Sequence, residues 1–182
     1  MTAHIVSVST TWVSLDGMTD TPWLSDDEHR LWRAYLDATR LLLQELDRQL
    51  VSDAALPFSD YEILVLLSEA PERRLRMSEL ADASTVSRSG ITRVVARLAK
   101  AGQVRRVECE SDKRGAWAEL TDDGAAQLAQ AGPGHVAAVR ANMLDLLSPR
   151  DIMVMTHRFS EMRQHLLDDR GARAHPAPES LS

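Results

Sequence analysis

The sequence predicts a mainly α-helical fold, with six helices and a small β-hairpin, and three observations support this prediction. Apolar residues recur every three or four positions along several segments. Two short runs rich in strand-forming residues, 104–109 and 116–120, flank a polar turn. The chain of 182 residues is long enough for one sizeable core but short for two, so we expect one principal domain.

The first helix is expected to span residues 25–52. Ser25 and Glu28 have the spacing of a capping box, in which each side chain bonds to the backbone N–H of the other residue. An apolar series follows on one side of this helix: Trp32, Tyr35, Leu36, Leu42, Leu43, Leu46 and Leu50. Residues 1–24 show no sustained period, so we expect a disordered or irregular extension there, and residues 1–17 either belong to it or lie upstream of the native start.

The second, third and fourth helices follow one another closely. Ser59 is expected to cap the second helix, and Pro71 is expected to end it. A short third helix is expected at 78–83. The fourth is expected to begin after Ser87, as its N-cap, and to end at Gly102, because glycine suits a left-handed C-terminal cap.

The hairpin is followed by two longer helices. A short strand at 74–76 is expected to extend the hairpin to three strands. Thr121 is expected to cap the fifth helix, in which Pro133 should produce a kink or an interruption because proline lacks a backbone N–H. Ser148 marks the start of the sixth helix, and the tail 171–182 has the composition of a disordered segment.

Positive charge gathers in one segment of an acidic chain. Residues 84–114 carry eight basic and three acidic side chains, although the net charge of the whole chain is −6. A basic patch on an acidic protein attracts polyanions to one place and repels them elsewhere. The sequence has no run of about 18 apolar residues, so we expect no membrane-spanning helix.

The fourth helix has two different faces. Ile91, Val94, Val95 and Leu98 share one side and are predicted to be buried. The opposite side is small, hydroxylic and basic, which suits the major groove, because hydroxyls bond phosphates or bases and arginine can make two bonds to guanine. The predicted DNA-binding residues of this helix are Ser87, Arg88, Ser89, Thr92, Arg93 and Arg97, of which Arg88 and Arg97 are expected to favour phosphate.

The third and fourth helices predict a helix-turn-helix, and the basic hairpin that follows predicts a wing. The winged helix-turn-helix core is expected at about 55–121. Lys113 and Arg114, at the wing tip, are predicted to bind DNA, with Arg114 entering a narrow, strongly negative minor groove. Asp112 is predicted to orient a wing arginine through an ion pair.

Two segments resemble the MarR family of bacterial transcription regulators. The segment "DKRGAWAELTDDG" is similar to the family's wing signature, and the matching residues are Asp112, Arg114, Leu120, Thr121 and Gly124. The segment "LADASTVSRSGITRVVARLAKAGQV" resembles the family's helix-turn-helix, and the resemblance covers about 25–170. Two residues depart from the pattern: Gln103 replaces an aliphatic residue and is expected to loosen the helix-to-wing junction, and Gly90 replaces a larger residue.

The resemblance implies an α+β winged-helix homodimer that binds pseudo-palindromic double-stranded DNA, more often as a repressor than as an activator. It places the dimerisation helices at about 25–52 and 121–170. Apolar stripes on the first and last helices support a dimer independently, because one small winged-helix core cannot cover them. Many members of the family leave DNA when they bind small phenolic or lipophilic ligands, and Trp32 and Tyr35 are candidates for an effector pocket, although core packing is the commoner role at this spacing.

Other functions are less well supported by the sequence. Cys109 offers a redox-sensing alternative, but Glu108 and Glu110 oppose a lowered thiol pKa, so a structural thiol is favoured. A winged-helix protein-interaction module without DNA binding is a second alternative. The sequence has no convincing metal-ligand spacing, phosphate-binding glycine loop or nucleophile with a base, so we predict no metal, no cofactor and no enzymatic activity. One cysteine and no secretion signal predict a cytoplasmic protein.

Overall fold

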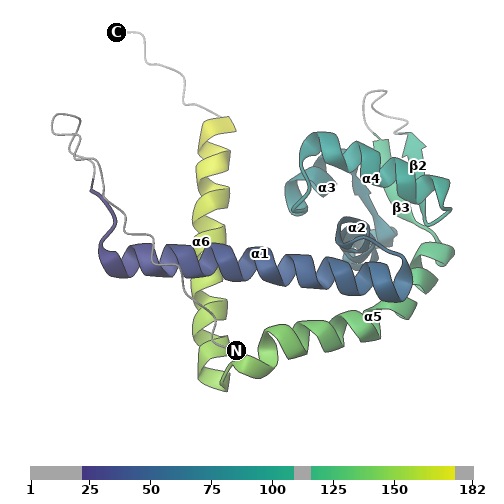
Figure 1. Cartoon of the computed structure of the whole chain (residues 1–182). Coiled ribbons are helices and arrows are strands. Elements are labelled where there is room, and N and C mark those ends of the chain that lie inside the picture. The colour runs from purple at the N-terminus through teal and green to yellow at the C-terminus, as the bar shows by residue number, and fades with distance from the viewer. Residues whose placement is uncertain (1–21, 109–115, 175–182) are drawn as a thin grey trace, which may run out of the picture. The chain divides into compact units, whose positions relative to one another are not determined.

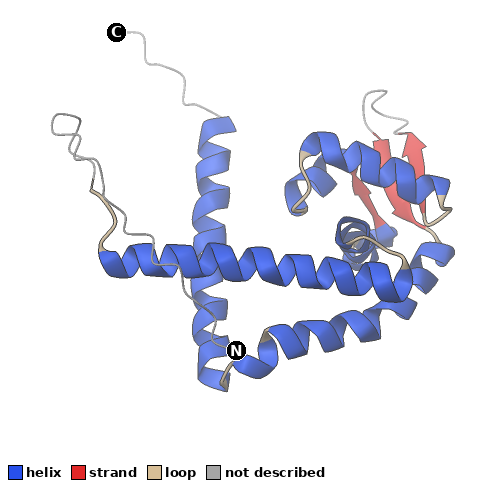
Figure 2. Ribbon diagram, in the orientation of Figure 1, coloured by secondary structure: helices blue, strands red, loops and turns tan. Residues whose placement is uncertain are grey.

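The structure, a computed structural model, describes residues 22–108 and 116–174, with side chains described up to residue 169. Its described part contains six α-helices, two short 3₁₀ helices and one three-stranded sheet (Figures 1 and 2). The elements are α1 Asp26–Ala54, α2 Phe58–Glu69, η1 Pro71–Arg73, β1 Arg74–Arg76, α3 Met77–Ala83, α4 Arg88–Lys100, β2 Val104–Glu108, β3 Ala116–Leu120, α5 Asp122–Asn142, η2 Leu144–Leu146 and α6 Pro149–Ala174. The predicted mainly α, winged-helix fold class is confirmed.

The chain divides within α1 into two compact units, Met1–Asp37 and Ala38–Ser182. In the smaller unit, α1 begins with the predicted capping box. The backbone N–H of Ser25 donates to Glu28 Oε2 at 2.8 Å, and the backbone N–H of Glu28 donates to Ser25 Oγ at 3.4 Å. Because the hydroxyl and the backbone N–H of Ser25 both donate to the carboxylate, the pKa of Glu28 is lowered.

The sheet of the larger unit has the strand order β1-β3-β2, and both pairs are antiparallel (Figure 2). Leu75 of β1 pairs with Ala118 of β3, and Val104 of β2 pairs with Leu120. Ala118, Val104 and Leu120 are buried, so this face of the sheet lies on the core and the alternate residues lie on the outer face. The predicted third strand is therefore present at the predicted residues.

The hydrophobic core forms where α2, α3 and α4 pack with the sheet. Its largest fully buried side chains are Leu50, Ile63, Leu64, Leu67, Leu80, Ile91, Val95 and Leu98. The predicted apolar stripe of α4 is buried along its whole length. Burial of one face of α4 determines which face points outward, and this is the face that carries the predicted DNA contacts.

The start of α2 differs from the prediction. Ser59 does not cap the helix, which begins at Phe58, two residues before the predicted start, with Pro57 at the N-cap position. The backbone N–H of Phe58 donates to Asp47 Oδ1 of α1 at 2.8 Å, so a carboxylate from another helix satisfies this terminal donor. The hydroxyl of Ser59 donates instead to Asp60 Oδ1, at 3.0 Å.

The end of α1 lies two residues beyond the predicted position. The helix ends at Ala54 because Ala55 adopts a left-handed backbone conformation, with φ 51°. The backbone N–H of Ala55 donates to the Val51 carbonyl at 3.1 Å, as in the αL C-cap motif, and the N–H of Leu56 donates to the Leu50 carbonyl at 3.3 Å.

The fifth helix is continuous through Pro133, so of the predicted kink or interruption the interruption is excluded. Contacts on both sides of the proline hold α5 against the core. Ala131 is buried, and the ring of His135 lies 4.4 Å from the ring of Tyr61 on α2. This packing offsets the loss of one backbone hydrogen bond.

Candidate nucleic-acid interface

The helices α3 and α4 form the helix-turn-helix (Figure 1). On α4, a polar face lies opposite the buried stripe. The exposed residues on this face include Ser89, Thr92 and Arg93, together with the small Ala96. Hydroxyl groups and a guanidinium can bond both phosphates and base edges, and small side chains let a helix approach the major groove. The structure therefore brings these three predicted DNA-binding residues together on one exposed surface.

Ser87 fixes the beginning of α4, as the sequence predicted. Its Oγ accepts a hydrogen bond from the backbone N–H of Gly90 at 3.2 Å and lies 3.4 Å from Ser89 Oγ. A Cβ on Gly90 would lie only 2.6 Å from Val86 Cγ1, so the packing of the preceding turn explains the glycine at this position. The positive end of the helix dipole is thus combined with exposed hydroxyl groups.

Arg88, the first residue of α4, forms an ion pair with α3. Its Nη2 lies 2.8 Å from Asp82 Oδ1, and both side chains are largely exposed. Ion pairs between exposed side chains contribute little to stability, so a DNA phosphate can replace Asp82 at small cost.

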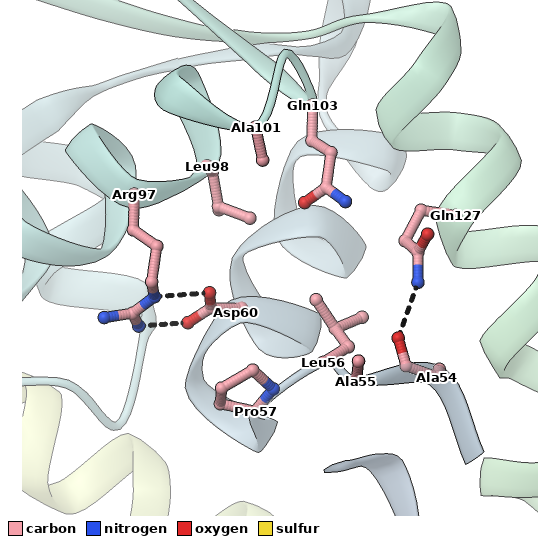
Figure 3. A pocket seen from close by; sticks show the side chains of 10 residues that line it. All are labelled: Ala54, Ala55, Leu56, Pro57, Asp60, Arg97, Leu98, Ala101, Gln103 and Gln127. Atoms are coloured by element: carbon pink, nitrogen blue, oxygen red, sulfur yellow. Dashed lines mark hydrogen bonds and ion pairs between the residues drawn. The ribbon is translucent and has the colours of Figure 1, made fainter. Parts of the chain in front are cut away.

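Arg97 has a different environment from the one the sequence suggested. Its Nε donates to Asp60 Oδ2 at 2.7 Å, and its Nη2 donates to Asp60 Oδ1 (Figure 3). Asp60 is only 3% exposed, whereas 51% of the Arg97 side chain is exposed. Hydrogen bonding to Asp60 raises the pKa of Arg97. Because the guanidinium is held against α2, we do not include Arg97 among the DNA contacts proposed below.

A cavity of about 450 Å³ lies beside the Asp60–Arg97 pair (Figure 3). Its walls come from the corner between α1 and α2, the end of α4 and the first half of α5, and they include Leu56, Leu98, Gln103 and Gln127. The side-chain amide of Gln127 donates to the Ala54 carbonyl at 3.1 Å, which ties α5 to the end of α1. The cavity therefore lies where four helices of the larger unit meet.

Two carboxylates of α2 hold the segment around α4, and sequence reasoning had selected neither. Asp60 bonds to Arg97, and Glu62 accepts hydrogen bonds from the backbone N–H of Thr85 at 2.9 Å and from its hydroxyl at 2.8 Å. A signal existed for Asp60, which is the first residue of the buried i, i+3, i+4, i+7 series of α2. A charged residue in such a series needs a partner, because burial of an unpaired charge is costly.

The strands β2 and β3 form the described part of the wing. The predicted tip residues Asp112, Lys113 and Arg114 lie outside the described residues, as does Cys109, so their roles stay predictions. Below the tip, Nη2 of Arg105 on β2 lies 2.7 Å from Glu119 Oε1 on the neighbouring strand β3.

The outer face of the sheet carries further basic residues, which lie outside the segment 84–114. The guanidinium groups of Arg74 and Arg76 lie 5.2 and 5.0 Å from the centre of the Trp117 ring, within the range of cation–π interactions. The predicted third strand brings these two arginines to the wing, but the sequence analysis located positive charge only within residues 84–114 and did not select them.

The junction between α4 and the wing is tightly held. Gly102 has the predicted positive φ, 75°. The backbone N–H of Gln103 donates to the Leu98 carbonyl at 2.9 Å, and the Gln103 carbonyl accepts from the backbone N–H of Thr121 at 3.1 Å. A Cβ on Gly124 would lie 2.1 Å from the Gln103 carbonyl oxygen. The expected loosening at Gln103 is therefore wrong, because backbone groups rather than its side chain make this junction.

Trp32 and Tyr35, the candidates for an effector pocket, belong to the smaller unit. Their rings stack on each other with centres 6.0 Å apart, and both side chains are partly exposed. No structural feature assigns them a ligand, and their effector role stays a prediction.

The described residues offer neither a metal site nor a membrane-spanning helix. Residues 22–108 and 116–174 contain no group of three histidine, cysteine, aspartate or glutamate residues arranged to hold a metal ion. None of the helices described is both long and apolar enough to cross a membrane.

Comparison with known proteins gives concordant matches. The MarR family model matches residues 56–115. Sco3205 from Streptomyces coelicolor, a MarR family transcriptional regulator whose crystal structure is of a complex with DNA, is 45% identical, has a TM-score of 0.75, and aligns over 79% of this chain and 94% of its own. AbsC, a MarR family transcriptional regulator from the same organism, is 40% identical with a TM-score of 0.74, over 81% of this chain and 99% of its own. The HTH-type transcriptional repressor YetL of Bacillus subtilis (strain 168) is 41% identical over 83 residues, which are 46% of this chain and 50% of YetL.

Proposed function

This chain belongs to the MarR family of transcriptional regulators, and we propose that it binds specific sequences in double-stranded DNA as a homodimer and represses transcription there. The observation that carries the proposal is the outward face of α4, on which Ser89, Thr92 and Arg93 are exposed opposite a fully buried stripe. The solved structure of Sco3205 is of a complex with DNA, and its 45% identity supports the same activity in this chain.

The proposed interface has a base-specific part and a phosphate part. Arg93 bonds to base edges in the major groove, where the two ends of its guanidinium can bond the two acceptors of guanine. Ser89 and Thr92 bond to bases or phosphates beside it. Ser87 and Arg88 lie at the beginning of α4, where the helix dipole favours a phosphate, and they position the helix along the duplex.

The wing supplies a second contact in this proposal. Arg114 enters the minor groove beside the site of α4, Lys113 bonds to a phosphate, and Asp112 orients an arginine of the wing. The support is the sequence signature of these residues and their position between β2 and β3, two strands that the structure describes on either side of the tip. Cationic side chains bind best where the minor groove is narrow, as in A/T-rich DNA.

Homodimerisation is proposed from apolar residues that the helices leave exposed. On α6, Ile152, Met162 and Leu166 are 41%, 44% and 54% exposed, and they follow a helical spacing. On α1, Leu31 and Trp32 are 72% and 50% exposed. A second copy that covers these residues forms a two-fold dimer, and its two recognition helices contact half-sites about 10 base pairs apart in a pseudo-palindromic operator.

Repression and ligand release complete the proposal. YetL, which is 41% identical over its matched segment, is a transcriptional repressor. A repressor of this kind is released when a small phenolic or lipophilic ligand favours a dimer whose recognition helices no longer fit both half-sites.

The proposal is tested by fluorescence anisotropy with the DNA upstream of the protein's own gene and with a scrambled duplex, at several salt concentrations. We expect tight binding to the upstream duplex alone, with affinity that falls steeply as salt increases, because phosphate contacts release counterions. Equal, weak binding to both duplexes contradicts sequence-specific recognition of this region.

Two variants separate the two parts of the interface. Arg93→Ala should relax the preference at particular base pairs, at a cost of about 1–3 kcal/mol for a lost bidentate contact. Arg114→Ala should weaken binding to most duplexes, with the greatest loss on A/T-rich flanks. Arg163→Ala on α6, outside the basic segment, is the matched control and should bind like the unaltered protein. If Arg93→Ala and Arg114→Ala also bind like the unaltered protein while folded, the assigned interface is wrong.

A further inference from the structure

Side chains of α2 form hydrogen bonds to the turn before α4, the recognition helix, and to a residue near the end of α4. At the beginning, Glu62 holds Thr85 in the turn before α4, and near the end, Asp60 holds Arg97. The two carboxylates lie two residues apart on α2, whereas their partners lie twelve residues apart along the chain. Two carboxylates of one helix thus reach groups on both sides of the DNA-contacting residues.

The contact of Asp60 with Arg97 has a defined geometry. Two nitrogens of the guanidinium donate to the two oxygens of one carboxylate, one of them at 2.7 Å, and Ser59 Oγ donates to the same carboxylate at 3.0 Å. A bidentate pair of this kind fixes both the distance and the orientation of its partners. Because Asp60 is 3% exposed, few waters can take the place of Arg97.

The contact of Glu62 with Thr85 acts on the backbone as well as on a side chain. One carboxylate oxygen accepts from the Thr85 N–H at 2.9 Å, and the other accepts from the Thr85 hydroxyl at 2.8 Å. Thr85 lies two residues before Ser87, the N-cap of α4, so this contact fixes where the recognition helix begins.

These two contacts constrain the rotation and the position of α4, which apolar packing alone constrains less. The buried stripe of α4 holds the helix to the core, but the hydrophobic effect is not directional and leaves small rotations and shifts of the helix inexpensive. Hydrogen bonds at two points along a helix oppose rotation about its axis and sliding along it. DNA contacts demand such precision, since a base-specific bond requires a donor within a few tenths of an ångström of its acceptor.

We propose that Asp60 and Glu62 form a two-point clamp that fixes the recognition helix α4 in the orientation for specific DNA binding, and that Arg97 is a positioning residue of this clamp rather than a DNA contact. The inference rests on the proposed function for its DNA measurements, but the clamp itself is measured without DNA below. If Arg97 turned to a phosphate, Asp60 would remain buried and unpaired, which disfavours that exchange.

The first test compares Asp60→Asn and Glu62→Gln with the unaltered protein on the specific and scrambled duplexes. The clamp predicts that each variant binds the specific duplex at least about tenfold more weakly, whereas binding to the scrambled duplex changes less than about twofold. Electrostatics alone predicts the opposite, because removal of a negative charge near a basic surface strengthens DNA binding. Stronger binding of the specific duplex by both variants therefore overturns the proposal.

The matched control is Glu45→Gln, which removes a carboxylate that bonds to Arg48 within α1. This variant should bind both duplexes like the unaltered protein. Equal losses on both duplexes by the clamp variants would indicate general unfolding and would also contradict a positioning role.

The salt dependence tests the role assigned to Arg97. A residue that bonds to a phosphate contributes about 0.9 to the slope of log affinity against log salt. Arg97→Gln should lower the affinity for the specific duplex while leaving this slope unchanged, and the double variant Asp60→Asn with Arg97→Gln should bind no more weakly than the worse single variant. A slope reduced by about 0.9, or losses that add, would show that Arg97 contacts DNA independently of Asp60.

Amide hydrogen exchange of the free protein measures the clamp without DNA. Asp60→Asn and Glu62→Gln should each raise the exchange rates within residues 88–100 several-fold, while Glu45→Gln should not. Unchanged rates in both clamp variants overturn the proposal. If the unaltered protein binds no specific DNA, the proposed function fails, and these exchange rates alone decide whether the clamp exists.

Discussion

Apolar residues in the region around α4 are buried, whereas several of those on the helix α6 are exposed. Ile63, Leu67 and Ile91, in the region around α4, are at most 1% exposed. On α6, Met153 and Leu166 are 67% and 54% exposed. The first region completes its core within one chain, whereas the second lacks a covering surface among the described residues. The region around α4 is thus a completed core, and the exposed residues of α6 support the proposal that this helix belongs to an interface between copies.

The largest expected effect comes from charges placed on the apolar stripe of α6. Met162→Glu with Leu166→Glu, one helical turn apart, should convert the dimer into a monomer, because two buried carboxylates lack partners in the interface. A monomer loses the benefit of two linked half-sites, so operator binding should weaken by roughly 10² or more. Light scattering after gel filtration measures the mass, and anisotropy measures the binding.

Gln164→Glu introduces a charge on the side of α6 opposite this stripe, and it should leave the dimer intact. A double variant Met162→Glu with Leu166→Glu that stays dimeric would contradict the assignment of α6 to the interface.

The second-largest expected effect is a loss of folding stability when the ion pair of the buried Asp60 is broken, compared with an exposed ion pair. Arg97→Ala leaves the carboxylate of Asp60 without its cation, and it should destabilise the fold by about 2–3 kcal/mol, below the 3–5 typical of fully buried pairs because half of Arg97 is exposed. Arg48→Ala, which breaks an exposed pair with Glu45, should leave the stability unchanged. Urea unfolding at fixed protein concentration measures both. Equal losses would show that the burial of Asp60 has no energetic consequence.

A smaller change in folding stability is expected from alanine substitutions at two glycines of α5. Gly124→Ala places a Cβ 2.1 Å from the Gln103 carbonyl oxygen, and this overpacking should cost about 1–3 kcal/mol. Gly132→Ala meets nothing within 4 Å outside its chain neighbours, but Pro133 disfavours a Cβ on the helical residue before it, so the helix-propensity gain of about 0.5–1 kcal/mol is offset and the stability should change little. Thermal unfolding of both variants provides the measurement. A stabilising Gly124→Ala would show that the junction between α4 and the wing has more room than described.

The smallest effect is a dependence of stability on pH. Burial lowers the pKa of His135, so the unfolded chain takes up a proton at higher pH than the folded chain does. The stability that His135 contributes is complete above its ordinary pKa of about 6.5 and is lost as the pH falls through that value toward the lower folded pKa. His135→Phe keeps a ring beside Tyr61 and should lose less stability between pH 7.5 and 5.5 than the unaltered protein, as measured by urea midpoints. Equal losses would remove His135 from the account.

Features that depend on neighbouring residues were predictable from the sequence. The capping boxes of α1 and α6 and the N-caps of α4 and α5 involve side chains and backbone groups within three residues of each other. The buried stripe of α4 follows from helical spacing alone. Short strand-forming runs also predict the three strands, and the wing signature predicts the family. Membership of a family of transcription regulators confirms the prediction that this chain is not an enzyme.

Features that depend on distant residues were not predictable. Asp60 and Arg97 are 37 residues apart, and Glu62 and Thr85 are 23 apart, so neither contact has a local pattern. The sequence predicts Arg97 as a DNA contact because its charge and helical position are visible there, whereas its bond to Asp60 is not. The same reason explains the error at Ser59, since Asp47 of α1 satisfies the start of α2.

Selection from a pool of random duplexes tests whether α4 contacts specific bases from a two-fold dimer. The pool is incubated with the unaltered protein, the bound DNA is recovered and sequenced, and the cycle is repeated at moderate salt. We expect an enriched inverted repeat with half-sites about 10 base pairs apart, and we expect Arg93→Ala to lose the preference at one position in each half-site. Bound DNA that matches the starting pool in sequence would contradict the claim.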